Sequence, residues 1–145
     1  MKVNWVQWSG LWLLFSLSAY ASAGTLQPFS SDGCSRFPDG TWQQQDVWKS
    51  CCVAHDLSYW RGGTADERDH ADAQLQQCLA QQGYPAIGWV MLLGVKVGGL
   101  PYWPSDFRWG YGWPFLRGFK ALSAQEQQQI DAMLLQQGTL IGNMQ

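Results

Sequence analysis

Charged residues are scarce in this chain, and those present do not cluster. They make up 14% of the 145 residues, with nine Lys and Arg against eleven Asp and Glu. No run of basic residues occurs anywhere in the sequence. Binding to nucleic acid depends on clustered Lys and Arg that neutralise phosphates. The composition therefore excludes nucleic acid as an expected partner.

The chain also lacks an apolar run long enough to span a bilayer. Residues 1–23 begin with Lys2, continue through an apolar stretch from Leu11 to Phe15 and end in small residues, which is the layout of a signal peptide. The small residues are Ala19, Ala21 and Ala23. No cysteine directly follows them to receive a lipid, and we expect cleavage after Ala23, which leaves residues 24–145 as one domain. An uncleaved anchor is the alternative, but the stretch is short of the roughly 20 residues that a bilayer requires.

Cysteine is absent after residue 78. The four cysteines are Cys34, Cys51, Cys52 and Cys78. A small exported domain normally oxidises such a set, so we expect two disulfides and a secreted or periplasmic location. Zinc is the alternative use of four cysteines, but the adjacent Cys51 and Cys52 do not provide the paired short spacings of structural zinc sites.

Four segments are predicted to be helical, so the expected fold class is all-α. They cover residues 42–60, 64–82, 85–100 and 123–138. The first contains neither Gly nor Pro, and its apolar residues recur at helical spacing. The second and fourth each begin with a capping box, in which Ser or Thr is followed three residues later by Glu. The third is apolar but interrupted by Gly and Lys, which favours a buried or interfacial helix over a membrane span.

Two segments are predicted to be loops. Residues 24–41 are rich in turn-forming Gly, Pro, Ser and Asp. Residues 101–119 carry a high density of aromatic side chains punctuated by Gly and Pro. Trp103, Trp109 and Trp113 in this aromatic loop favour contact with a lipid interface. Core packing is the other interpretation, because a small pair of helices leaves apolar surface that aromatic rings can cover.

An imidazole and a carboxylate are predicted to point inward from the first two helices. His55 lies on the apolar side of the first, and Asp72 lies on the apolar stripe of the second, where a carboxylate requires a partner. A carboxylate bonded to one ring nitrogen leaves the other free as a general base. The alternative for His55 is a core histidine with satisfied hydrogen bonds. Asp56, about 100° further round the helix, suits a hard cation, whereas His70 is predicted to be a solvated residue without a role.

The motif around His55 identifies a family resemblance. The segment Cys51-Cys52-Val53-Ala54-His55-Asp56-Leu57-Ser58-Tyr59 resembles the active-site helix of secreted phospholipase A2, which reads Cys-Cys, two residues, His-Asp, two residues, Tyr. Asp72, followed six residues later by Cys78, is similar to the second catalytic helix of that family. The resemblance covers residues 32–78 and is to the bacterial, two-disulfide branch.

The resemblance implies a phospholipase A2-like domain over residues 24–145. Its active site would be carried by a disulfide-linked antiparallel helical hairpin, with additional helices towards the C-terminus. The implied disulfides join Cys51 to Cys78 and Cys52 to Cys34. If Cys51 is bonded to Cys78, a rise of ~1.5 Å per residue places His55 and Asp72 within ~3 Å of the same level along the two helices. Their side chains could then form a hydrogen bond.

The resemblance also implies roles for the site residues. His55 and Asp72 would form the catalytic pair, and Tyr59 would support it by a hydrogen bond to the Asp. Asp56 would bind Ca²⁺ together with Asp32 and Gly33, which fit the positions of an acidic residue and a carbonyl ligand in the bacterial branch. The denser Gly pattern of the animal calcium loop is missing, so the remaining carbonyl ligands are left open.

The expected function is calcium-dependent hydrolysis of the sn-2 ester of glycerophospholipids at a membrane surface, by water that His55 activates. One alternative is a catalytically silent, phospholipase-like module that binds lipid or protein. Another is a toxin-like or inhibitory interaction domain that uses the aromatic loop as its contact surface. Calcium-dependent release of fatty acid from mixed liposomes distinguishes these three functions.

Overall fold

The fold is built from helices. The computed structural model describes residues 24–142, which contain four helices and no strand. The helices are α1 (Lys49–Arg61), α2 (Ala65–Gln81), α3 (Pro85–Gly98) and α4 (Ala124–Gly142). The predicted all-α class is confirmed, whereas the predicted signal peptide, residues 1–23, lies outside the described residues. No helix between residues 24 and 142 is long and apolar enough to cross a bilayer.

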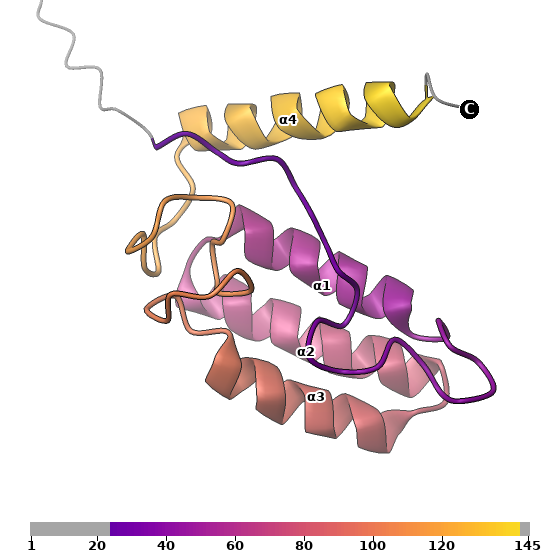
Figure 1. Cartoon of the computed structure of the whole chain (residues 1–145). Coiled ribbons are helices and arrows are strands. Elements are labelled where there is room, and N and C mark those ends of the chain that lie inside the picture. Colours follow the sequence, from indigo (N-terminus) through magenta and orange to yellow (C-terminus); the bar gives the residue numbers. More distant parts are fainter. Residues whose placement is uncertain (1–23, 143–145) are drawn as a thin grey trace, which may run out of the picture.

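The helices are stacked, with α2 between α1 and α3 and with α4 on the far side of α1 (Figure 1). A short turn at residues 62–64 joins α1 to α2, and it requires glycine because Gly62 and Gly63 have φ angles of 66° and 143°. Thr64 then caps α2, and both hydrogen bonds of the predicted capping box with Glu67 are present.

Both expected disulfides are present. Cys51 is bonded to Cys78, which ties α1 to α2, and Cys52 is bonded to Cys34, which ties the loop before α1 to that helix. The first core cluster surrounds these bridges and includes Trp48, Leu79 and Met91. The sulfur links and this core therefore fix α1 against both α2 and the preceding loop.

The predicted start of the first helix, at Trp42, is wrong. Residues 42–48 form turns, and α1 begins only at Lys49. Trp48 explains the difference, because its buried indole donates to the carbonyl of Pro38 at 2.7 Å and its backbone N–H donates to that of Asp39 at 3.1 Å. These contacts fold the chain back on the preceding loop. Helical spacing in the sequence gave no sign of this tertiary contact.

Two of the three tryptophans in the aromatic loop belong to the core, so the lipid interpretation is wrong for those two. Trp109 and Trp113 are buried, and only Trp103 is exposed. The indole of Trp109 donates to the carbonyl of Gly63 at 2.9 Å, and that of Trp113 donates to the carbonyl of Arg61 at 2.7 Å. The loop therefore packs against the C-terminal end of α1 and against the turn that joins α1 to α2.

Helix α4 begins at the second predicted capping box. Ser123 and Glu126 exchange the two expected hydrogen bonds, at 3.2 and 2.8 Å. Glu126 is buried and also accepts from Arg117 at 2.6 Å and from Lys120 at 3.3 Å. The helix continues past the predicted end at Gly138 to Gly142.

Glu126 is expected to make the fold sensitive to acid. The hydrogen bond from Arg117 and those from Ser123 hold the pKa of Glu126 well below its ordinary value, against the opposing effect of burial. A lowered pKa in the folded state stabilises the fold above the ordinary pKa, and this stabilisation is lost as the pH falls towards the folded value. Glu126→Gln should cost about 2 kcal/mol near neutral pH, because it leaves Arg117 without its counter-charge, and should flatten the acid dependence.

Urea unfolding at several pH values measures this effect. Glu67→Gln is the matched control, since Glu67 holds the same capping-box position on α2 but is exposed. The control should cost less than about 1 kcal/mol. Equal losses in the two variants would contradict the role of the buried ion pair.

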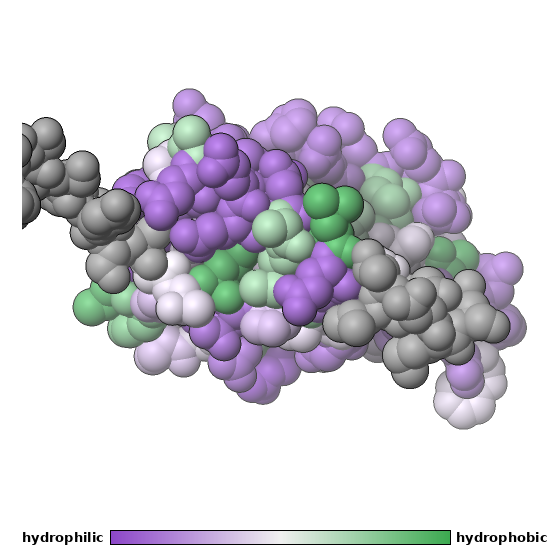
Figure 2. All heavy atoms as spheres, turned by 90° about the horizontal axis from the view of Figure 1, so that it is seen from above, coloured by the Kyte–Doolittle hydropathy of each residue, from purple (hydrophilic) through white to green (hydrophobic). Residues whose placement is uncertain are grey.

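The surface differs in polarity between α4 and α3. Seen from above, the face over α4 is mostly hydrophilic, with scattered hydrophobic side chains (Figure 2). On α3, by contrast, four apolar side chains are more than half exposed: Trp89, Val90, Leu93 and Val97. The third predicted helix is confirmed as α3. Its exposed apolar side chains form a stripe at the surface.

Candidate functional site

The side chains of α1 and α2 meet at a buried hydrogen-bonded centre. Nε2 of His55 lies 3.1 Å from Oδ1 of Asp72, and the hydroxyl of Tyr59 donates to the same oxygen at 2.7 Å. Asp72 is fully buried, and His55 is 8% exposed. Because a carboxylate can only accept hydrogen bonds, Nε2 carries the ring proton and Nδ1 keeps a free lone pair. The structure thus brings together the three residues that the sequence predicted as a catalytic group.

Tyr59 acts in this centre as a neutral donor. Burial, and after it the charge of Asp72, raises the pKa of Tyr59 above its ordinary value. Its ring stacks beside the imidazole of His55, with the centroids 4.2 Å apart, and meets Trp109 edge-on at 5.1 Å. Gly99 packs closely against its ring and hydroxyl, and a Cβ at this position would overlap Tyr59. Tyr59 is therefore held rigidly against Asp72.

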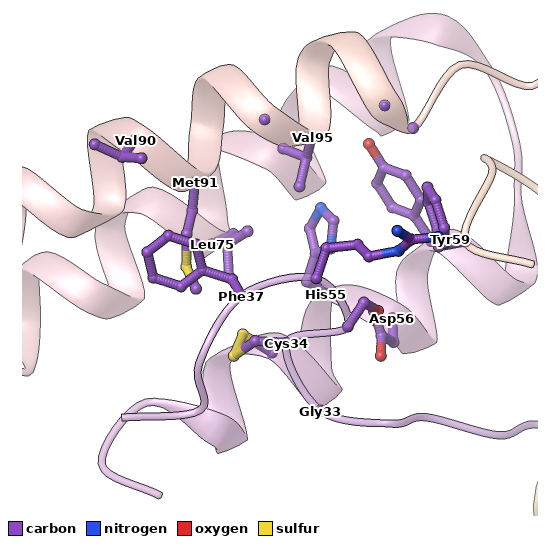
Figure 3. A pocket seen from close by; sticks show the side chains of 17 residues that line it. Gly33, Cys34, Phe37, His55, Asp56, Tyr59, Leu75, Val90, Met91 and Val95 are labelled. Atoms are coloured by element: carbon purple, nitrogen blue, oxygen red, sulfur yellow. A yellow bond between two sulfur atoms is a disulfide. The ribbon is translucent and has the colours of Figure 1, made fainter. Parts of the chain in front are cut away.

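A cavity of about 600 Å³ opens in front of His55. Its walls are mainly apolar, with Leu75 from α2 and Val90, Met91 and Val95 from α3 (Figure 3). Gly94 and Gly98 also line it, and a Cβ at Gly94 would meet open space. The volume suits a ligand with extended hydrocarbon. An apolar chain can therefore lie along α3 with its polar end at His55.

Asp56 turns away from His55 towards a second, smaller cavity of about 250 Å³. Oxygen-bearing side chains line this cavity: Ser30, Ser31, Asp32, Ser35, Asp56, Asp106 and Tyr111. One carboxylate oxygen of Asp56 accepts from the hydroxyl of Ser31 at 2.6 Å, and Oδ1 of Asp32 accepts from that of Ser35 at 2.7 Å. Asp56 also lines the larger cavity, so it stands between the two.

Asp56 shares this cavity with two further carboxylates, Asp32 and Asp106. Burial is the main cause that raises the pKa of Asp56 to about 6, and the charge of Asp32 contributes to the rise, whereas the Ser31 hydrogen bond and His55 oppose it. Within residues 24–142, no three His, Cys, Asp or Glu side chains are grouped closely enough to hold a metal ion on their own. Calcium accepts backbone carbonyls and water as ligands, so a site on Asp56 would need them.

Gly33 lies in the loop beside Asp56. It is buried, has a φ of 81° and donates its backbone N–H to Ser31 Oγ at 3.2 Å. Asp39 fixes the next residue, since its carboxylate accepts from the N–H of Cys34 at 2.7 Å. The disulfide to Cys52 joins this loop to α1. The structure therefore brings Asp32, Gly33 and Asp56 to one region, as the sequence predicted.

Sequence reasoning missed two residues of the centre. Arg68 is 6% exposed and donates from Nε to the hydroxyl of Tyr59 at 3.1 Å. Gly99 provides the close approach to Tyr59 described above. A signal for Arg68 existed, because it precedes Asp72 by one helical turn and so shares its buried stripe. His70, by contrast, is exposed, as predicted.

Comparison of the chain with protein-family models, with curated proteins and with solved structures found no match. The family resemblance therefore rests on the residues of the motif, and functional inference rests on the geometry of the centre.

Proposed function

We propose that the protein is a calcium-dependent phospholipase A2-type hydrolase, exported to the periplasm or the cell exterior. The observation that carries this proposal is the buried contact of His55, Asp72 and Tyr59 at the end of an apolar cavity. In this proposal α1 and α2 form the antiparallel hairpin that carries the active site. The two disulfides are consistent with folding in an oxidising compartment.

The reaction assigns one role to each group of the centre. The free Nδ1 of His55 takes a proton from water, whose oxygen attacks the carbonyl carbon of the sn-2 ester. Asp72 holds the ring in the required tautomer and stabilises the imidazolium that forms. The imidazolium then gives its proton to the departing glycerol oxygen, which releases a fatty acid and a lysophospholipid. Tyr59 keeps Asp72 in place and takes no part in the proton transfers.

Asp56, with Asp32 and the carbonyl of Gly33, would hold the calcium ion. The oxygen-bearing side chains around Asp56, and the like charge of Asp32 beside it, fit a hard cation. When bound, calcium supplies a positive charge that polarises the ester carbonyl and stabilises the oxyanion. Asp56 lines both cavities, so a cation there would adjoin the ester in front of His55.

The apolar stripe of α3 fits a lipid surface. Trp89, Leu93 and Val97 follow each other at intervals of one turn and are exposed. The neighbouring Val90 and Gly94 line the cavity, so the stripe borders its entrance. An acyl chain could then pass from a bilayer into the cavity without crossing water.

Liposomes with a labelled sn-2 acyl chain test the proposal. We expect release of the labelled fatty acid with calcium and none after chelation. Asp56→Asn should remove the calcium response, and Asp131→Asn, an exposed residue on α4, is the control. Binding to liposomes without release would support the silent module instead, and neither binding nor release would support the interaction domain.

A further inference from the structure

A buried cation behind the catalytic pair has no role in the reaction as described above. Arg68 lies on α2, one turn before Asp72, and is 6% exposed. Its Nη2 donates to the carbonyls of Val95 and Lys96 at 2.8 and 3.0 Å. These carbonyls lie in the last turn of α3, where the helix dipole favours a positive charge. Arg68 therefore connects the centre to the wall of the apolar cavity.

The contacts of Arg68 also set the direction of the hydrogen bonds. A guanidinium can only donate, so the Tyr59 oxygen accepts from Nε of Arg68 at 3.1 Å. The phenolic proton is then committed to Asp72, at 2.7 Å. Without Arg68, the Tyr59 oxygen would lose the donor that commits its proton to Asp72.

Arg68 is also the counter-charge of Asp72. Its Nη2 lies 3.8 Å from Oδ2 of Asp72, an oxygen that has no hydrogen-bond partner within the described part of the chain. An ionised carboxylate that is fully buried requires a nearby positive charge. While His55 is neutral, Arg68 supplies this positive charge.

We infer that Arg68 is a positioning residue that holds Tyr59, Asp72 and His55 in one hydrogen-bonded order and anchors them to the C-terminal end of α3. It acts through Tyr59 and Asp72 and does not line the cavity. This inference rests on the proposed function, since it assigns a part in the same reaction.

Three variants test the inference: Arg68→Met, Arg68→Lys and Lys96→Met. The last removes another contact between α2 and α3, the exposed Lys96–Asp69 pair at 2.7 Å, without touching the centre. Arg68→Met should lower kcat about 10- to 100-fold, with KM within about twofold, because the base is misplaced while the cavity remains. Arg68→Lys should recover most of kcat, since an ammonium can donate to Tyr59. Lys96→Met should behave as the wild type.

A role confined to tying α3 to α2 gives a different pattern. Both Arg68 variants would then lose stability and raise KM, kcat at equal folded fraction would stay unchanged, and the inference would be overturned.

NMR of the histidine rings gives a readout that does not depend on activity. Long-range proton–nitrogen correlations of the neutral ring report which nitrogen carries the proton, and His70 is an internal reference. His55 should be protonated at Nε2 in the wild type and in Lys96→Met, and mixed in Arg68→Met. If the wild type hydrolyses no ester, the proposed function fails, and this measurement alone decides on Arg68. An unchanged tautomer in Arg68→Met overturns the inference.

Discussion

Replacing His55 with Gln is expected to lower ester hydrolysis by about 10²- to 10⁴-fold, the contribution of a positioned general base. Glutamine is close to histidine in size and can still donate to Asp72, so the buried carboxylate keeps a partner. It has no nitrogen lone pair to take a proton from water. The variant should therefore lose the reaction and keep the fold.

The chain contains its own control for this substitution. His70 is its second histidine, lies on α2 and is exposed, so His70→Gln should hydrolyse lipid at the wild-type rate. Initial rates of fatty acid release, compared at equal calcium and equal liposome concentration, provide the measurement. Circular dichroism and the urea midpoint establish that both variants are folded. Wild-type rates in His55→Gln would remove His55 as the base.

The contact between His55 and Asp72 was predictable because two constraints act on the same pair of helices. Helical rise fixes how far each residue lies from the cysteine on its own helix. The bridge between Cys51 and Cys78, the pairing that the family resemblance implies, then brings His55 and Asp72 to the same level along the two helices. The observed distance of 3.1 Å between Nε2 of His55 and Oδ1 of Asp72 agrees with the predicted hydrogen bond.

Arg68 was not predicted, although part of the signal was present. Spacing alone places it on the stripe of Asp72. Long arginine side chains on a helix usually reach water, however, so a position on the stripe does not establish burial. What buries Arg68 is the end of α3, whose carbonyls accept from it. That contact depends on how α3 packs on α2, which no local pattern specifies.

Two of the differences between the predictions and the structure have the same cause. Trp48 holds residues 42–48 out of a helix by its hydrogen bond to the carbonyl of Pro38. Trp109 is held in the core by its hydrogen bond to the carbonyl of Gly63. In both cases the indole N–H finds a backbone carbonyl remote in sequence, and the ring is buried with it. Composition shows that tryptophan is abundant, but it does not show which carbonyl each indole reaches.

The bridge between Cys51 and Cys78 should contribute most to stability among the features described here. It closes a loop with a sequence separation of 27, which corresponds to about 3.5 kcal/mol of lost entropy in the unfolded chain. Domains of this size are stable by roughly 5 to 15 kcal/mol, so its loss removes a large fraction. The bridge also lies one helical turn from His55, so His55 and Asp72, the proposed catalytic pair, should separate more readily without it.

The variant Cys51→Ala with Cys78→Ala is therefore expected to unfold at a markedly lower urea concentration and to lose most hydrolysis even where it is folded. Cys34→Ala with Cys52→Ala is the matched control, since its bridge closes a shorter separation of 18 and should cost about 3 kcal/mol. This second bridge ties the loop of Asp32 and Gly33 to α1 and does not join α1 to α2. Its loss should weaken the response to calcium while the Nε2 tautomer of His55 persists. If the Nε2 tautomer of His55 is lost equally in both double variants, the bridge between α1 and α2 has no special part in aligning His55 with Asp72.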